Sequence, residues 1–169
     1  MLRFLFPYKN YPTSVNLMLL VLRLLFGVLL MWHGVVKIVN FGDIVTSFPD
    51  PLGVGSRMSL YMVIFAEVVC SMGVIVGAFY RLALIPPIFS MLIAFLVIHN
   101  HDAFAAKELA LIFLVMFCLM FCMGAGSLSL DNIIASLLHK NEAEDNSVSH
   151  PVSANRQETP LPTDDAPRQ

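Results

Sequence analysis

The chain has 169 residues, of which 57% are hydrophobic and only 13% are charged. Soluble domains contain about 45–50% apolar and about 25% charged residues, so this chain has too few polar groups for a water-facing surface. Nine of its charged residues lie between Lys140 and Arg168, which leaves the rest of the chain poorer still in charge. This composition excludes a soluble enzyme, and the lack of a basic stripe excludes a nucleic-acid binder. It predicts an integral membrane protein.

Four apolar segments are long enough to cross a bilayer, which takes about 20 residues of α-helix. The predicted spans are residues 17–39, 59–80, 84–100 and 107–126. An unbroken helix over residues 59–100 would be about 63 Å long, about twice the bilayer core. We therefore expect a turn at Gly77–Arg81, with Pro86 and Pro87 in the first turn of the third helix, where a missing N–H costs little. The predicted fold class is all-α, an integral membrane four-helix bundle.

The two ends of the chain differ from the spans. The first apolar segment is too long for a cleavable signal peptide. Residues typical of membrane-interface anchors precede it, namely Arg3, Phe4, Phe6, Tyr8, Lys9 and Tyr11. A short interfacial helix is predicted by apolar residues on one face, namely Ile133, Ile134, Leu137 and Leu138. Residues 1–140 are thus expected to form the membrane domain, and residues 141–169 a disordered cytoplasmic tail. The Lys and Arg near the span ends favour both termini in the cytoplasm.

The first span has an unusual polar face. Arg23, Gly27, Gly34 and Lys37 recur at helical spacing and share one face, and His33 lies close to it. An ionisable group at the bilayer centre costs about 2.5–3.5 kcal/mol, so we expect this face to point into the bundle. The glycines would allow close packing of the helices, and this role is predicted for Gly27, Gly34, Gly73 and Gly77.

Counting residues from the outer span ends indicates which polar groups lie at similar depth. At about 1.5 Å per residue, Lys37 lies about 3 Å deep, His33 about 9 Å and Glu67 about 12 Å. Glu108, near the start of the fourth span, is level with Lys37. The predicted intramembrane polar site consists of Arg23, His33, Lys37, Glu67 and Glu108. It is either a charge-compensated structural network or a proton-relay or ligand site.

The sequence contains candidate metal ligands and cysteines, but their patterns do not support the prediction of a metal or redox thiol site. A metal site would combine His99, His101, Asp102 and Glu108, but a lone His-x-His pair in a loop is too weak a pattern for us to predict one. His33 and His99 differ in depth, which disfavours paired axial haem ligands. Cys70 and Cys118 have similar predicted depths, yet cysteine in lipid is usually a small packing residue, and no Cys-x-x-Cys motif is present.

These residues together resemble the DoxX family of small four-helix membrane proteins over roughly residues 22–134. The resemblance rests on the order and spacing of Arg23-x-x-x-Gly27, His33-Gly34-x-x-Lys37, Glu67 with Gly77 and Arg81, Glu108-x-Ala110, and Gly124-Ala-Gly126-Ser-Leu-Ser129-Leu-Asp131. Many relatives have a proline between the last two glycines, where this chain has Ala125.

The resemblance implies a bacterial inner-membrane bundle associated with redox work. Some relatives look like membrane subunits of quinone-linked thiosulfate oxidation, and others are tied to oxidative-stress complexes. For this chain it implies an accessory or quinone- and proton-handling subunit of a membrane-associated oxidoreductase, with oxidoreductase proteins as partners. The chain has no self-sufficient catalytic motif. The alternative is a small transporter or membrane scaffold whose intramembrane charges are purely structural.

Overall fold

A computed structural model describes residues 11–134 and 136, and this part of the chain is all-helical, as predicted. Four helices are long and apolar enough to cross a membrane: Thr13–Val39, Ser56–Val76, Tyr80–Ile98 and Phe104–Met123. Each begins three or four residues before its predicted span, and in the first two spans polar residues such as Thr13 and Ser56 form the first turn. The predicted anchors before Tyr11, the end of the interfacial helix and the tail lie outside the described residues.

The spans are built from the following elements. The first is α2 (Thr13–Val39), which is followed by the one-turn helix α3 (Phe41–Ile44). The second consists of α4 (Ser56–Ile64), the π-helix η1 (Phe65–Cys70) and α5 (Ser71–Val76). The third consists of α6 (Tyr80–Ile93) and the π-helix η2 (Ala94–Ile98), and the fourth is α7 (Phe104–Met123).

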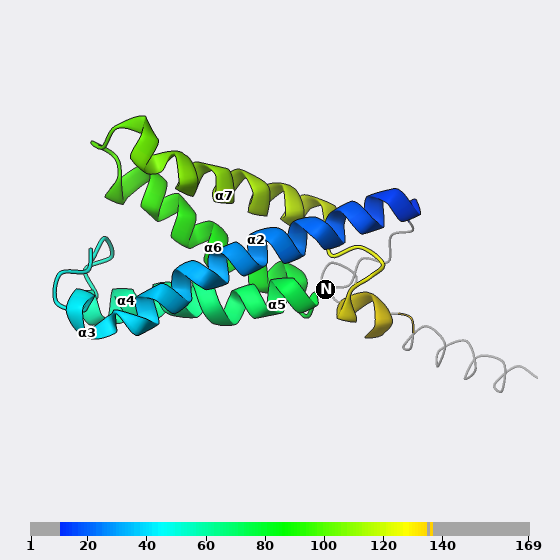
Figure 1. Cartoon of the computed structure of the whole chain (residues 1–169), viewed down its shortest axis with the longest axis horizontal. Coiled ribbons are helices and arrows are strands. Elements are labelled where there is room, and N and C mark those ends of the chain that lie inside the picture. The colour runs from blue at the N-terminus through cyan, green and yellow to red at the C-terminus, as the bar shows by residue number, and fades with distance from the viewer. Residues whose placement is uncertain (1–10, 135, 137–169) are drawn as a thin grey trace, which may run out of the picture.

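The spans form two antiparallel pairs, α2 with α4–η1–α5 and α6–η2 with α7. Figure 1 shows the pairs converging where residues 77–79 and 124–134 lie, which we call the tail end. They diverge toward residues 40–55, which we call the loop end (Figure 1). A buried apolar cluster, with Leu30, Tyr80 and Phe117 among its members, joins the pairs.

The turn between the second and third spans lies at Gly77–Phe79. Gly77 has a φ of 74° and ends α5 in the left-handed conformation, which glycine adopts without strain. α6 then begins at Tyr80, so the structure contradicts the placement of Pro86 and Pro87 in a first helical turn, because both lie inside α6. A proline there removes one helical hydrogen bond, which packing against neighbouring helices offsets in membrane proteins.

The outer faces of all four spans are apolar. Large hydrophobic side chains are exposed on each of them, for example Trp32 (65%), Val69, Leu82 and Val115. A water-soluble monomer rarely exposes apolar surface on this scale, whereas lipid requires it.

Candidate functional site

Arg23 closes the tail end of the bundle. Its side chain is 2% exposed and donates hydrogen bonds to three backbone carbonyls. Nη1 lies 2.7 Å from the oxygen of Ala125, and Nη2 lies 2.9 Å from that of Leu128 and 3.5 Å from that of Ile75. The guanidinium therefore neither extends to the lipid headgroups nor contacts another residue of the predicted polar site.

Asp131 and Asn16 complete this closure. The two carboxylate oxygens of Asp131 each accept a 2.8 Å hydrogen bond, from the backbone N–H of Phe79 and of Tyr80. Asp131 thus caps the start of α6 from a distant part of the chain, which explains why α6 begins before the predicted span. Asn16 accepts a 2.9 Å hydrogen bond from the Ser127 N–H. The segment 124–131 is thereby fastened across the tail end.

Lys37 and Glu67 form an ion pair near the loop end. Lys37 Nζ lies 2.6 Å from Glu67 Oε2, and the side chains are 24% and 5% exposed. Gly34 makes this contact possible, because a Cβ there would lie 2.9 Å from the Cβ of Glu67 and 2.5 Å from Val68 Cγ2. Gly34 is thus level with Glu67, and Lys37 lies one turn nearer the loop end. Helical side chains lean toward the N-terminus of their helix, so Lys37 extends back into the bundle to reach Glu67.

Of the remaining predicted site residues, His33 lies near this pair and Glu108 lies apart from it. His33 is half-buried with its ring edge-on to Phe113 at 6.0 Å between centroids, and it is close enough to Glu67 to interact electrostatically. Glu108 is exposed on α7. Of the five residues, the structure therefore joins Lys37 and Glu67, places His33 nearby, and separates Arg23 and Glu108 from them.

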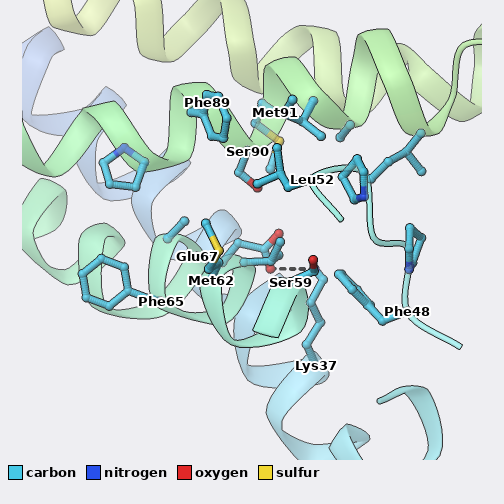
Figure 2. Close-up of a pocket in the computed structure, with 18 of the residues that line it drawn as sticks. Lys37, Phe48, Leu52, Ser59, Met62, Phe65, Glu67, Phe89, Ser90 and Met91 are labelled. Atoms are coloured by element: carbon cyan, nitrogen blue, oxygen red, sulfur yellow. Dashed lines mark hydrogen bonds and ion pairs between the residues drawn. The ribbon is translucent and has the colours of Figure 1, made fainter. Parts of the chain in front are cut away.

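A cavity of about 700 Å³ borders the ion pair, within the range of about 300–1,000 Å³ common for ligand sites. It lies where the two helix pairs diverge, between α4–η1 and α6–η2 (Figure 2). Its polar lining comes from Lys37, Ser59, Tyr61, Glu67, Ser90 and His99. Its other walls are apolar and include Phe48, Leu52, Met62, Phe65, Phe89 and Met91. A cavity of this composition suits an apolar molecule with one polar end.

Both π-helices border the cavity. η1 contributes Phe65, Ala66 and Glu67, and η2 contributes Ala94 and Ile98. π-Helical turns are rare and occur frequently at functional sites, because they shift side chains out of the regular helical register. Periodicity analysis assumes regular helices, so it could not identify this cavity.

The described residues show neither a metal-ligand cluster nor a disulfide. No three His, Cys, Asp or Glu side chains gather to hold a metal ion in residues 11–134 and 136. His99 Nδ1 lies 2.7 Å from Asp102 Oδ2, as an exposed local pair. The three cysteines are free thiols, with Cys70 buried and Cys118 and Cys122 exposed on the outside of α7. Cys70 and Cys118 have similar predicted depths, but they do not form a disulfide.

Comparison with known proteins gives one finding. Residues 18–100 match the family model named DoxX, and this segment contains most of the first span, all of the second and third spans, the Lys37–Glu67 pair and the cavity. Curated proteins and solved structures give no match. The match identifies a DoxX domain over residues 18–100, and the four apolar helices fit a small membrane protein.

Proposed function

We propose that the protein binds the head of a lipid-soluble quinone in this cavity and handles its protons, as an accessory subunit of a membrane-associated oxidoreductase. The supporting observation is the Lys37–Glu67 ion pair, with Glu67 buried and Lys37 24% exposed, at the wall of a mostly apolar cavity. Intramembrane ionisable residues are costly, and by default they mark sites of ligand or proton handling.

The lining fits a quinone in shape and in polarity. A quinone has a flat ring with carbonyl acceptors and an apolar chain, and Phe65 and Phe89 offer apolar aromatic surface to such a ring. The Lys37 ammonium has three donors and Glu67 occupies one, so the others are available to a carbonyl oxygen. Glu67 keeps Lys37 in place and is an acidic group that can hold a proton beside the ligand.

A bound quinone would supply the capacity to accept electrons together with protons. The electrons would come from an oxidoreductase partner protein, as the family resemblance implies. The protein's own part is to hold the ring, exclude water through the apolar walls and keep a proton-carrying pair next to the ring. These roles require no catalytic motif beyond Lys37 and Glu67.

We further propose that the bilayer is the bacterial inner membrane, with the tail end in the cytoplasm. The support is the charge of the chain near the span ends: Arg3, Lys9, Arg81 and Lys140 belong to the tail side, against Arg57 and Lys107 at the loop end. Cytoplasmic segments retain the excess of Lys and Arg. Reporter fusions at both termini and in the 40–55 loop test this orientation, and a reporter exported from either terminus would contradict it.

Equilibrium binding of decylubiquinone to the protein in lipid nanodiscs tests the proposed ligand. Losing a hydrogen bond from a charged group costs about 1.5–3 kcal/mol, so Lys37→Met should weaken binding by about 10- to 100-fold. Glu67→Gln should also weaken binding, because Lys37 is then no longer held in place. Arg57→Met and Asp43→Asn are matched controls, since both residues are exposed and outside the cavity lining. Unchanged affinity in Lys37→Met would overturn the proposal.

A further inference from the structure

The loop between the first and second spans crosses the loop end of the cavity. Four of its residues line the cavity, namely Phe48, Pro49, Pro51 and Leu52. Figure 2 shows Phe48 and Leu52 at the edge of the cavity where this loop passes. Leu52 is also 45% exposed, so it contacts the cavity on one side and the surroundings on the other. We call residues 48–52 the lid segment.

Asp50, at the centre of the lid segment, ties it to the start of α4. Oδ1 accepts hydrogen bonds from the Ser59 hydroxyl at 2.7 Å and from the Val54 N–H at 3.0 Å. Oδ2 accepts one from the Gly55 N–H at 2.7 Å. Ser59 is 5% exposed and itself lines the cavity, so this carboxylate links the lid segment to the cavity wall. Pro49 and Pro51 on either side restrict the backbone and favour an extended approach to Asp50.

The opposite side of the cavity reaches the middle of the spans. Phe65 and Phe89 line it, and they are 52% and 46% exposed. Each lies nine residues from the nearest end of its span, which is about 14 Å at about 1.5 Å per residue. That depth is close to the centre of a hydrocarbon core about 30 Å thick. The cavity therefore meets lipid between α4–η1 and α6–η2.

We infer that the cavity takes its ligand laterally from the hydrocarbon core, while the Asp50-latched lid segment closes it to water at the loop end. This inference rests on the proposed function for the identity of the ligand, a quinone drawn from the membrane pool. Its geometry rests on the latch and the lipid-side opening alone. A quinone with a long apolar chain needs this arrangement, because its chain stays in lipid while the head reaches Lys37. A lid closed to water also keeps the Lys37–Glu67 pair from exchanging protons directly with the solution at the loop end.

Thiol labelling of a single cysteine in the cavity tests the inference. Ser90→Cys is introduced into a protein with Cys70→Ala, Cys118→Ala and Cys122→Ala, since Ser90 lines the cavity and differs from cysteine by one atom. In membranes, lipid-soluble N-phenylmaleimide should modify this thiol, and a membrane-impermeant sulfonated maleimide should not. Adding Asp50→Ala should raise the rate with the sulfonated reagent by about tenfold or more, since the latch loses its charge-assisted hydrogen bonds.

Controls separate an opened lid from a damaged protein. Thr46→Cys, exposed outside the lid segment, should react with the sulfonated reagent equally with and without Asp50→Ala. If Asp50→Ala lowers the melting temperature, Ser59→Ala removes one latch contact without touching the lid segment and should give a smaller increase in the same direction.

Two results would overturn the inference. One is a sulfonated reagent that reaches Ser90→Cys equally fast whether or not Asp50 is intact. The other is N-phenylmaleimide failing to reach it. Labelling is measured without quinone, so the two proposals can fail separately. If the labelling pattern is as expected but decylubiquinone does not bind, the inference about the lid stands and only the proposed ligand is wrong.

Discussion

Replacing Lys37 and Glu67 singly and then together distinguishes a ligand site from a purely structural ion pair. Their charged atoms are 2.6 Å apart, and the attraction at an effective dielectric constant of about 20 is about 6 kcal/mol. Lys37→Met leaves the buried Glu67 carboxylate without a partner, which costs about 3–5 kcal/mol of unfolding free energy. Glu67→Met should cost less, because Lys37 is 24% exposed. The double variant removes both charges, and such replacements are often neutral. The coupling energy should therefore be at least about 3 kcal/mol, the upper end for neighbouring residues.

Unfolding is followed by circular dichroism as sodium dodecyl sulfate is titrated into dodecylmaltoside micelles, and decylubiquinone binding is measured in nanodiscs on the same variants. Both single variants should lose stability, and the double variant should regain it. Quinone binding should be weakened in the two variants that lack Lys37, because methionine has no donor for a carbonyl oxygen. It should also be weakened in Glu67→Met, because Lys37 is then no longer held in place. Arg57→Met combined with Asp43→Met is the matched control, as these charges are exposed.

Two outcomes would refute this reasoning. Additive single effects would mean that the two charges do not depend on one another, against the observed geometry. A stable double variant with wild-type quinone affinity would mean that the pair only fixes the packing of α2 against η1. The small transporter or membrane scaffold would then be the better interpretation.

Three further predictions follow from other contacts. Gly34→Ala should lower the unfolding free energy by about 1–3 kcal/mol and weaken quinone binding, because its Cβ would lie 2.5 Å from Val68 Cγ2 and overpack the contact. Gly42→Ala is the control, since its Cβ would have no atom within 4 Å, and it should change neither property. Equal melting temperatures for the two variants would contradict this prediction. Arg23→Met should lower the unfolding free energy by about 2–5 kcal/mol in thermal unfolding, because it leaves buried carbonyls without a donor. Arg23→Lys should retain only part of this stability, since an ammonium cannot replace the planar guanidinium. Full stability with lysine would show that charge alone matters. The Ser59 hydroxyl, followed by the Gly55 N–H, lowers the pKa of Asp50 below its ordinary value of 3.8. The latch should therefore be complete above pH 3.8 and be lost as the pH falls through the lowered pKa. Hydrogen exchange of the Val54 and Gly55 amides, corrected for intrinsic rates, should lose protection only as the pH falls through that pKa.

The spans could be predicted because membrane helices follow from the length of apolar runs alone. The start of α6 could not, because its cap is Asp131, which lies 51 residues along the chain from Tyr80. A cap from so distant a residue leaves no local signal, so Pro86 and Pro87 were expected in a first turn that lies elsewhere.

The candidate site was predictable only in part. Depth counting placed Glu67 within reach of the polar face of α2, where Lys37 contacts it. The same face contains Arg23, but its partners are backbone carbonyls, which no residue type encodes. The cavity depends on two π-helical turns and on the divergence of the helix pairs at the loop end, and both arise from tertiary packing.

The two cations of α2, Arg23 and Lys37, contact different kinds of partner. This difference indicates which end of the bundle could carry out the proposed proton handling. They are 14 residues apart, which is about 21 Å along a helix. Arg23 is held by fixed carbonyl oxygens that cannot take up a proton, so it can close the tail end but cannot serve as one step of a relay. Lys37 is held by a carboxylate, a partner that can change charge, and both residues line the cavity. The proposed proton handling therefore belongs to the loop end, where the chain combines an ionisable pair, a mostly apolar cavity and the proposed lid segment.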